Sequence, residues 1–160
     1  MKYLYGLFVL ALTSLCFGQS PMKGTVAYSR EAIPGIPGKL ASHLPTSYLI
    51  YVTVGKGTSV SATCLYIQGR AYSSSLKRVE SPVQVARDVN VPTTQKDTLV
   101  KETPDDVYQV EVGDRASGEC GSRARKLAKQ NAVVVRVESG GSSWYGVAAK
   151  VVSLEPAAAP

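Results

Sequence analysis

The sequence contains a single histidine, three cysteines, one tryptophan and only two phenylalanines among its 160 residues. Structural zinc sites are built mainly from cysteine and histidine, so no metal is predicted here, and nothing indicates another cofactor. The one histidine, His43, belongs to no recognisable arrangement of nucleophile, base and orienting acid. The sequence therefore favours a protein without catalytic activity, and a small secreted hydrolase remains one alternative.

Several ligand-binding motifs are also absent. Gly55-Lys-Gly-Thr lacks the residue order of a phosphate-binding loop, and the pattern of an EF-hand calcium loop does not occur. Asp105 and Asp106 are adjacent carboxylates, but Pro104 before them is typical of a turn. No aromatic residues alternate with the basic residues of the 122–130 segment, so nucleic-acid binding is not expected.

Long apolar runs are missing after the first residues of the chain. Lys2 and an apolar run over residues 4–15 are typical of a secretory signal, and this run is too short to span a bilayer comfortably. We expect residues 1–18 to be removed near Gly18–Gln19, leaving a mature chain without a transmembrane segment. The alternative is lipidation at Cys16, although the bulky Leu15 before it does not suit a lipoprotein signal.

The mature chain is expected to be one β domain over residues 19–154, followed by a flexible Pro/Ala tail over residues 155–160. Without Lys2 its formal charge is 17 − 12 = +5, which favours partners that carry negative charge. Cys64 and Cys120 then form an even pair, and in an oxidising compartment such a pair predicts a disulfide. Secretion or a periplasmic, cell-envelope location is the corresponding expectation.

Short stretches with period-two alternation predict seven to nine strands separated by turns, and almost no helical periodicity is present. The expected strands cover residues 24–30, 48–54, 60–72, 83–91, 98–103, 107–112, 132–139 and 142–154. We expect residues 48–54 and 60–72 to form a hairpin. The pattern predicts an all-β fold, an antiparallel β-sandwich, with a small β-barrel as the alternative.

The clearest hairpin is predicted around Gly140-Gly141, because a Gly-Gly loop allows the primed turns that suit hairpins. This register places Val137 opposite Trp144 and Arg136 opposite Tyr145. Val133, Val135, Val137 and Trp144 then share a face, which we assign to the core. On the other face, we expect cross-strand packing with a cation–π contact between Arg136 and Tyr145. The alternative is an exposed aromatic near Arg136 that stacks on a sugar ring or binds a partner protein.

Residues 122–130 form the one predicted helical turn, with Ser122 as its N-cap. Ala124, Leu127 and Ala128 make a narrow apolar stripe, so the basic side chains of this segment should point into water. A stapled, solvated helix is one interpretation, and a site for an anionic ligand or partner is the other. The candidate patch comprises Arg123, Arg125, Lys126, Lys129, Arg136 and Tyr145.

The function expected from these features is that of an exported, non-catalytic binding or interaction protein. Its partner would be another envelope protein or an anionic glycan. The main alternative is a structural or assembly module that pairs through an exposed sheet edge.

Overall fold

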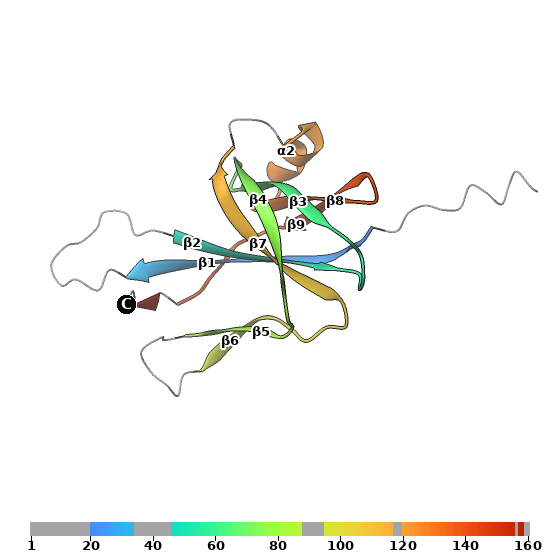
Figure 1. Ribbon diagram of the computed structural model, residues 1–160. Coiled ribbons are helices and arrows are strands. Elements are labelled where there is room, and N and C mark those ends of the chain that lie inside the picture. Colours follow the sequence, from blue (N-terminus) through green and yellow to red (C-terminus); the bar gives the residue numbers. More distant parts are fainter. Residues whose placement is uncertain (1–19, 34–45, 88–94, 117–119, 156, 159–160) are drawn as a thin grey trace, which may run out of the picture.

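The computed structural model describes residues 20–33, 46–87, 95–116, 120–155 and 157–158, which form strands and one short helix (Figure 1). The helix, α2, spans Ser122–Ala128. The strands are β1 (Met22–Ile33), β2 (Thr46–Val54), β3 (Ser61–Ile67), β4 (Arg70–Val79), β5 (Val83–Ala86), β6 (Lys96–Val100), β7 (Asp106–Arg115), β8 (Val133–Ser139), β9 (Ser142–Ala148), β10 (Val152–Ser153) and β11 (Ala157–Ala158). The predicted all-β class is confirmed. The predicted signal at residues 1–18 lies outside the described residues.

One large sheet contains most of the strands, in the order β10-β1-β2-β7-β4-β3-β8-β9, with β11 also paired to β1. Its pairs are antiparallel except that β10 and β11 run parallel to β1. A second sheet consists of β5 and β6 alone. The mostly antiparallel pairing agrees with the short, alternating strands of the sequence.

The large sheet curls so that β9, at one end of the strand order, packs against β1 near the other end. Gly146 of β9 lies at this contact, because a Cβ there would approach Met22 Cε to 2.6 Å and would meet Thr25 Oγ1. Among the described strands, no hydrogen-bonded ladder joins β1 to β9. The sheet is therefore curled back on itself but not closed by backbone pairing.

The inner face of this curled sheet holds the main core. Most of its side chains are β-branched or leucine, which fit a pleated surface well. The cluster consists of Ala27, Ile50, Val52, Val54, Leu65, Ile67, Val110, Val133, Val135, Val137 and Ala148. Val133, Val135 and Val137 are fully buried, as the alternation of β8 predicts.

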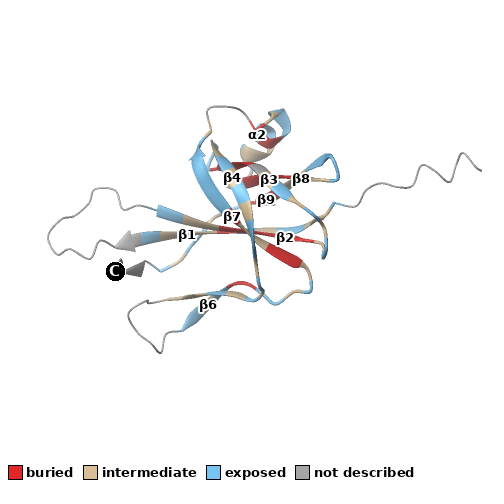
Figure 2. Ribbon diagram, viewed as in Figure 1, coloured by how far each residue is buried: buried red, intermediate tan, exposed pale blue. Residues whose placement is uncertain are grey.

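The outer face of the sheet is covered at two places, and Figure 2 shows buried residues in both covering elements, α2 and β6. Helix α2 covers β3 and β8, where its Ala124 packs with Tyr66 and Val134. The small β5–β6 sheet covers β2 and β7, where Leu99 packs with Tyr51 and Val107. Both faces of the strands beneath these covers are dry, so buried residues follow one another along the chain, as in Val133-Val134-Val135.

Polar contacts attach the β5–β6 sheet to β1. The Tyr28 hydroxyl donates to the Leu99 carbonyl at 2.8 Å, and the Arg30 guanidinium donates to the Ala86 carbonyl at 2.9 Å. Burial raises the pKa of the Tyr28 hydroxyl, so it stays protonated and able to donate to a higher pH than a free tyrosine does. Arg87 pairs with Asp97 at 2.8 Å, and the hydrogen bond and charge of that carboxylate raise the Arg87 pKa.

Asp106, the first residue of β7, is the one charged side chain buried among the described residues. Its carboxylate accepts a hydrogen bond from Arg78 of β4 at 2.5 Å and another from the Gly57 amide at 2.8 Å. The Gly57 contact fixes the turn between β2 and β3. The sequence predicts only a turn residue here, but Asp106 also joins β7 to β4 and to the β2–β3 turn. Two such partners are what a buried carboxylate requires.

The predicted hairpin of residues 48–54 with 60–72 is wrong. Strand β2 pairs with β1 and β7, whereas β3 pairs with β4 and β8. The second half of the predicted hairpin is itself divided, because Gln68 and Gly69 both adopt positive φ and form a tight turn between β3 and β4. Long-range pairing with β7 and β8 occupies the strand edges that a local hairpin would have used.

The contact between β1 and β9 can be tested by Gly146→Ala. The added methyl group would meet the stiff Thr25 side chain, so we expect a loss of about 1–3 kcal/mol in the free energy of unfolding. Gly24→Ala is the matched control, because its Cβ meets nothing within 4 Å. Denaturant titration of both variants gives the comparison, and equal stabilities would show that β9 does not pack closely on β1.

Candidate functional site

Helix α2 is attached to the outer face of the large sheet next to a pair of cysteines. Cys64 of β3 and Cys120, just before α2, lie at disulfide distance with their Cα atoms 5.6 Å apart. Both residues are buried in the cluster that also contains Ala124. This is the geometry that the predicted disulfide requires, and it places the start of the helix over β3.

The apolar stripe of α2 faces the sheet as the sequence predicts. Ala124 is buried, and Leu127 and Ala128 pack against the same cluster. The predicted N-cap is wrong: Gly121 occupies this position without a side-chain cap, and Ser122 is the first helical residue. Gly121 has a φ of 94°, a conformation in which glycine is favoured.

The four basic residues of the segment, Arg123, Arg125, Lys126 and Lys129, are all exposed on and just after α2. The helix itself contains no acidic residue. Arg125 and Lys126 lie in its last turn, where positive charge is favoured by the helix dipole. The outward surface of α2 is therefore strongly positive, and its apolar residues pack against the sheet.

Tyr145 of β9 lies next to this surface, between the sheet and Arg123 of α2. The hairpin register is as predicted, with Arg136 opposite Tyr145 and Val137 opposite Trp144. Tyr145 is half-buried and packs against the cluster under α2. The Arg123 guanidinium lies over the Tyr145 ring, 5.3 Å from its centroid. The helix and the hairpin thus meet through a cation–π contact.

Arg136 takes a different role from the one predicted. Its guanidinium donates to Glu138 Oε1 and to Ser143 Oγ, each at 3.0 Å, instead of lying over Tyr145. It also approaches the start of α2, because a Cβ on Gly121 would be 4.0 Å from Arg136 Nη1. The structure therefore brings Arg123, Arg136 and Tyr145 together, and Glu138 offsets one of the charges.

Trp144 does not belong to the core to which we assigned it. It is half-buried and is absent from the three core clusters of the described residues, whereas its partner Val137 is fully buried. Trp144 lies close to the Gly140-Gly141 turn, near the end of the β8–β9 hairpin, and it shares a pocket with residues at the start of β1. Its alternation predicts the correct face, but the end of the core could not be located from the sequence.

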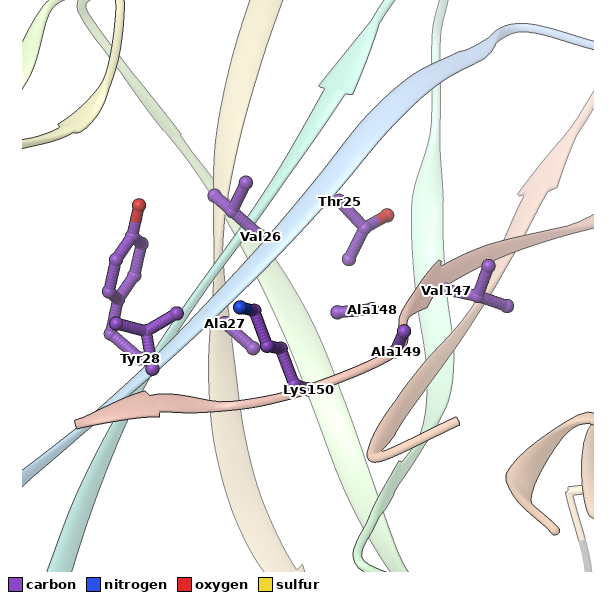
Figure 3. A pocket seen from close by; sticks show the side chains of 9 residues that line it. Thr25, Val26, Ala27, Tyr28, Val147, Ala148, Ala149 and Lys150 are labelled. Carbon is purple, nitrogen blue, oxygen red and sulfur yellow. The ribbon is translucent and has the colours of Figure 1, made fainter. Parts of the chain in front are cut away.

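An apolar groove follows the contact between β1 and β9 (Figure 3). It has a volume of about 310 Å³, and its lining includes Val26, Val147 and Val152. These are three of the four large apolar side chains that are exposed among the described residues. Among the described strands, the outer edge of β9 has no partner, and the edge of β1 that faces it is paired only farther along, with β10 and β11.

The described ranges bear on two features that the sequence does not predict for the mature chain, a metal centre and a membrane-spanning helix. They contain no group of three or more His, Cys, Asp or Glu side chains that could hold a metal ion. His43 lies outside these ranges. No helix in them is long and apolar enough to cross a membrane.

No family model, curated protein or solved structure matches this chain. Any functional conclusion therefore has to come from the residues themselves. The cysteine pair at disulfide distance is compatible with an extracellular or periplasmic location, where disulfides persist.

The contact between Arg123 and Tyr145 can be measured with a double-mutant cycle using Arg123→Gln and Tyr145→Leu. We expect a coupling of about 0.5–1 kcal/mol in the free energy of unfolding, typical of a cation–π contact near solvent. Lys126→Gln, on the same helix, should show no coupling to Tyr145→Leu. A larger coupling with Arg136→Gln than with Arg123→Gln would restore the cross-strand contact predicted from the sequence.

Proposed function

We propose that this chain is an exported, non-catalytic binding protein that uses the α2 surface to hold an anionic glycan. The single observation that carries the proposal is that the basic and the apolar side chains of α2 lie on opposite sides of the helix. Its cations are exposed, and its apolar residues are packed against the sheet. We define the basic surface as Arg123, Arg125, Lys126, Lys129, Arg136 and Tyr145.

The choice of a glycan over a protein follows from what the basic surface offers. Stable protein interfaces usually contain apolar or aromatic anchors that become fully buried. Tyr145 is the one aromatic residue of the basic surface, and it is half-buried beneath Arg123. A polyanion needs no such anchor, because several screened contacts add up along its length. Each contact contributes only about 0.2–1 kcal/mol. Because salt screens every one of these contacts, the binding should fall steeply as the salt concentration rises.

A sandwich-like architecture remains part of this proposal. In it the curled sheet encloses the main core, while α2 and the β5–β6 sheet cover its outer face. The small barrel is the alternative, and it would require backbone pairing between β1 and β9.

The triple variant Arg123→Gln, Lys126→Gln, Lys129→Gln tests the basic surface against heparin as a sulfated probe. Loss of three contacts should weaken binding about tenfold at low salt and lower the salt concentration needed for elution. The matched control is Lys56→Gln, Lys77→Gln, Lys96→Gln, which removes the same charge from exposed positions on other elements. The control should bind as the wild type does.

Equal weakening in both triple variants would mean that only net charge matters, and it would contradict a defined basic surface. Tighter binding to polyglutamate than to heparin would replace the glycan with an acidic protein as the partner class.

A second candidate function, assembly through a sheet edge, is favoured by the groove between β1 and β9. Strand β9 carries no charged residue, although charges are a common protection of exposed edges. The exposed Val26 and Val147 could pair with the same strands of a second copy. In this case the chain would be a subunit of a homo-oligomer, held together by strand pairing between copies.

Light scattering across a concentration series tests self-association. If β9 pairs between copies, the apparent mass should rise with concentration, and Val147→Lys should keep the chain monomeric. Val112→Lys is the matched control, because Val112 is similarly exposed but lies on β7, inside the strand order, where it is paired with Ser74 of β4. A monomer at every concentration would exclude this function.

A further inference from the structure

A second pocket lies at the end of the curled sheet, where three segments distant in sequence meet. They are the start of β1, the turn between β2 and β3, and the tip of the β8–β9 hairpin. The pocket has a volume of about 440 Å³, within the range of roughly 300–1,000 Å³ common for small-molecule sites. Its lining consists of Ser20, Pro21, Lys23, Gly55, Thr58, Ser139, Gly140, Ser142 and Trp144.

Trp144 supplies the largest aromatic surface in this pocket. The ring lies on the core-facing side of β9, opposite Val137, but it is only half-buried and packs in none of the core clusters found in the described residues. An indole that remains open to water at a pocket wall can stack against a flat ligand with apolar C–H groups. The position of Trp144 near the end of the hairpin leaves part of its ring available to a ligand in this pocket.

The other lining side chains are mainly hydroxyls. Ser139 Oγ already donates to the Ser59 carbonyl, and Ser20 Oγ accepts from the Met22 amide. Each hydroxyl still has further hydrogen-bonding capacity. Lys23 is the one charged residue of the lining, and no carboxylate lines the pocket. The pocket therefore combines an aromatic face, several hydroxyls and a single positive charge.

We infer that this pocket binds a sugar residue bearing a carboxylate, such as a uronic acid within an oligosaccharide. The apolar face of the sugar ring stacks on Trp144, and its hydroxyls exchange hydrogen bonds with the serine and threonine side chains. The Lys23 ammonium pairs with the carboxylate, a charge-assisted contact stronger than a neutral one. The site lies away from α2, so it does not depend on the basic surface.

Gly55 leaves the space that such a ligand needs. A Cβ at this position would lie 3.6 Å from Thr58 Oγ1 and 3.8 Å from Lys23 Cε, between two of the lining side chains. These are ordinary contact distances, and Gly55 does not have a positive φ, so a side chain can be placed there without backbone strain. A larger residue at Gly55 should fill the pocket and leave the fold intact.

Trp144 is the only tryptophan in the sequence, so its fluorescence reports directly on the pocket. Titration of the mature chain with trigalacturonate should give a saturable change in Trp144 emission. Gly55→Val should abolish this change, whereas the matched control Gly24→Val should retain it, because a Cβ at Gly24 meets open space. Lys23→Met should weaken binding at least tenfold, and Lys56→Met, on the neighbouring turn, should not.

Three results would overturn the inference: no saturable change with trigalacturonate, an unchanged response in Gly55→Val, or an unchanged affinity in Lys23→Met. Equal affinity for neutral maltotriose would overturn the assignment of an acidic sugar. If Gly55→Val did not fold, as judged by circular dichroism, Lys23→Met would still decide the question. The triple variant Arg123→Gln, Lys126→Gln, Lys129→Gln, which should bind heparin more weakly, should keep the Trp144 response. This result separates failure of the pocket from failure of the basic surface.

Discussion

The attachment of α2 to β3 is the constraint on which the rest of the candidate binding surface depends. A helix of 7 residues is not stable alone, and its stripe of Ala124, Leu127 and Ala128 buries little apolar area. A covalent link between Cys64 and Cys120, 56 positions apart, would contribute roughly 4 kcal/mol by restricting the unfolded chain. Such a link would hold the helix start in place, where Arg123 lies over Tyr145 and the other cations are exposed.

Covering the outer face also explains the burial pattern of the large sheet. A sheet with one wet face shows strict alternation, but here α2 and the β5–β6 sheet keep parts of the outer face dry. Val134 is consequently as well buried as Val133 and Val135. The covering is incomplete at several places, among them the groove between β1 and β9 and the pocket beside Trp144. Both candidate sites outside α2 lie where the layers end.

Local patterns in the sequence predict the local structure well. Alternation and the Gly140-Gly141 turn predict the β8–β9 hairpin together with its register, and the apolar stripe predicts the inward face of α2. Pairings between distant segments could not be predicted in this way. The β2–β3 hairpin is wrong because β7 and β8 compete for the same edges, and a single sequence contains no signal for that competition.

The candidate site shows the same division. The sequence identifies the basic residues of α2 because they are close together in the chain, and it pairs Arg136 with Tyr145 because they face each other across a hairpin. It misses the contact of Arg123 with Tyr145, which requires the helix to fold over the sheet. It also misses the partners of Asp106, since Arg78 and Gly57 come from two other segments. Side chains that meet through tertiary packing need the structure to be found.

The central claim is that a disulfide between β3 and the start of α2 presents the basic surface outside the cytosol. Alkylation of the mature chain, purified without reductant and followed by peptide mass spectrometry, tests this claim most directly. The account predicts that Cys64 and Cys120 resist alkylation in denaturant until a reductant is added, and that their peptides are recovered as one linked species. Alkylation of both cysteines before reduction would contradict it.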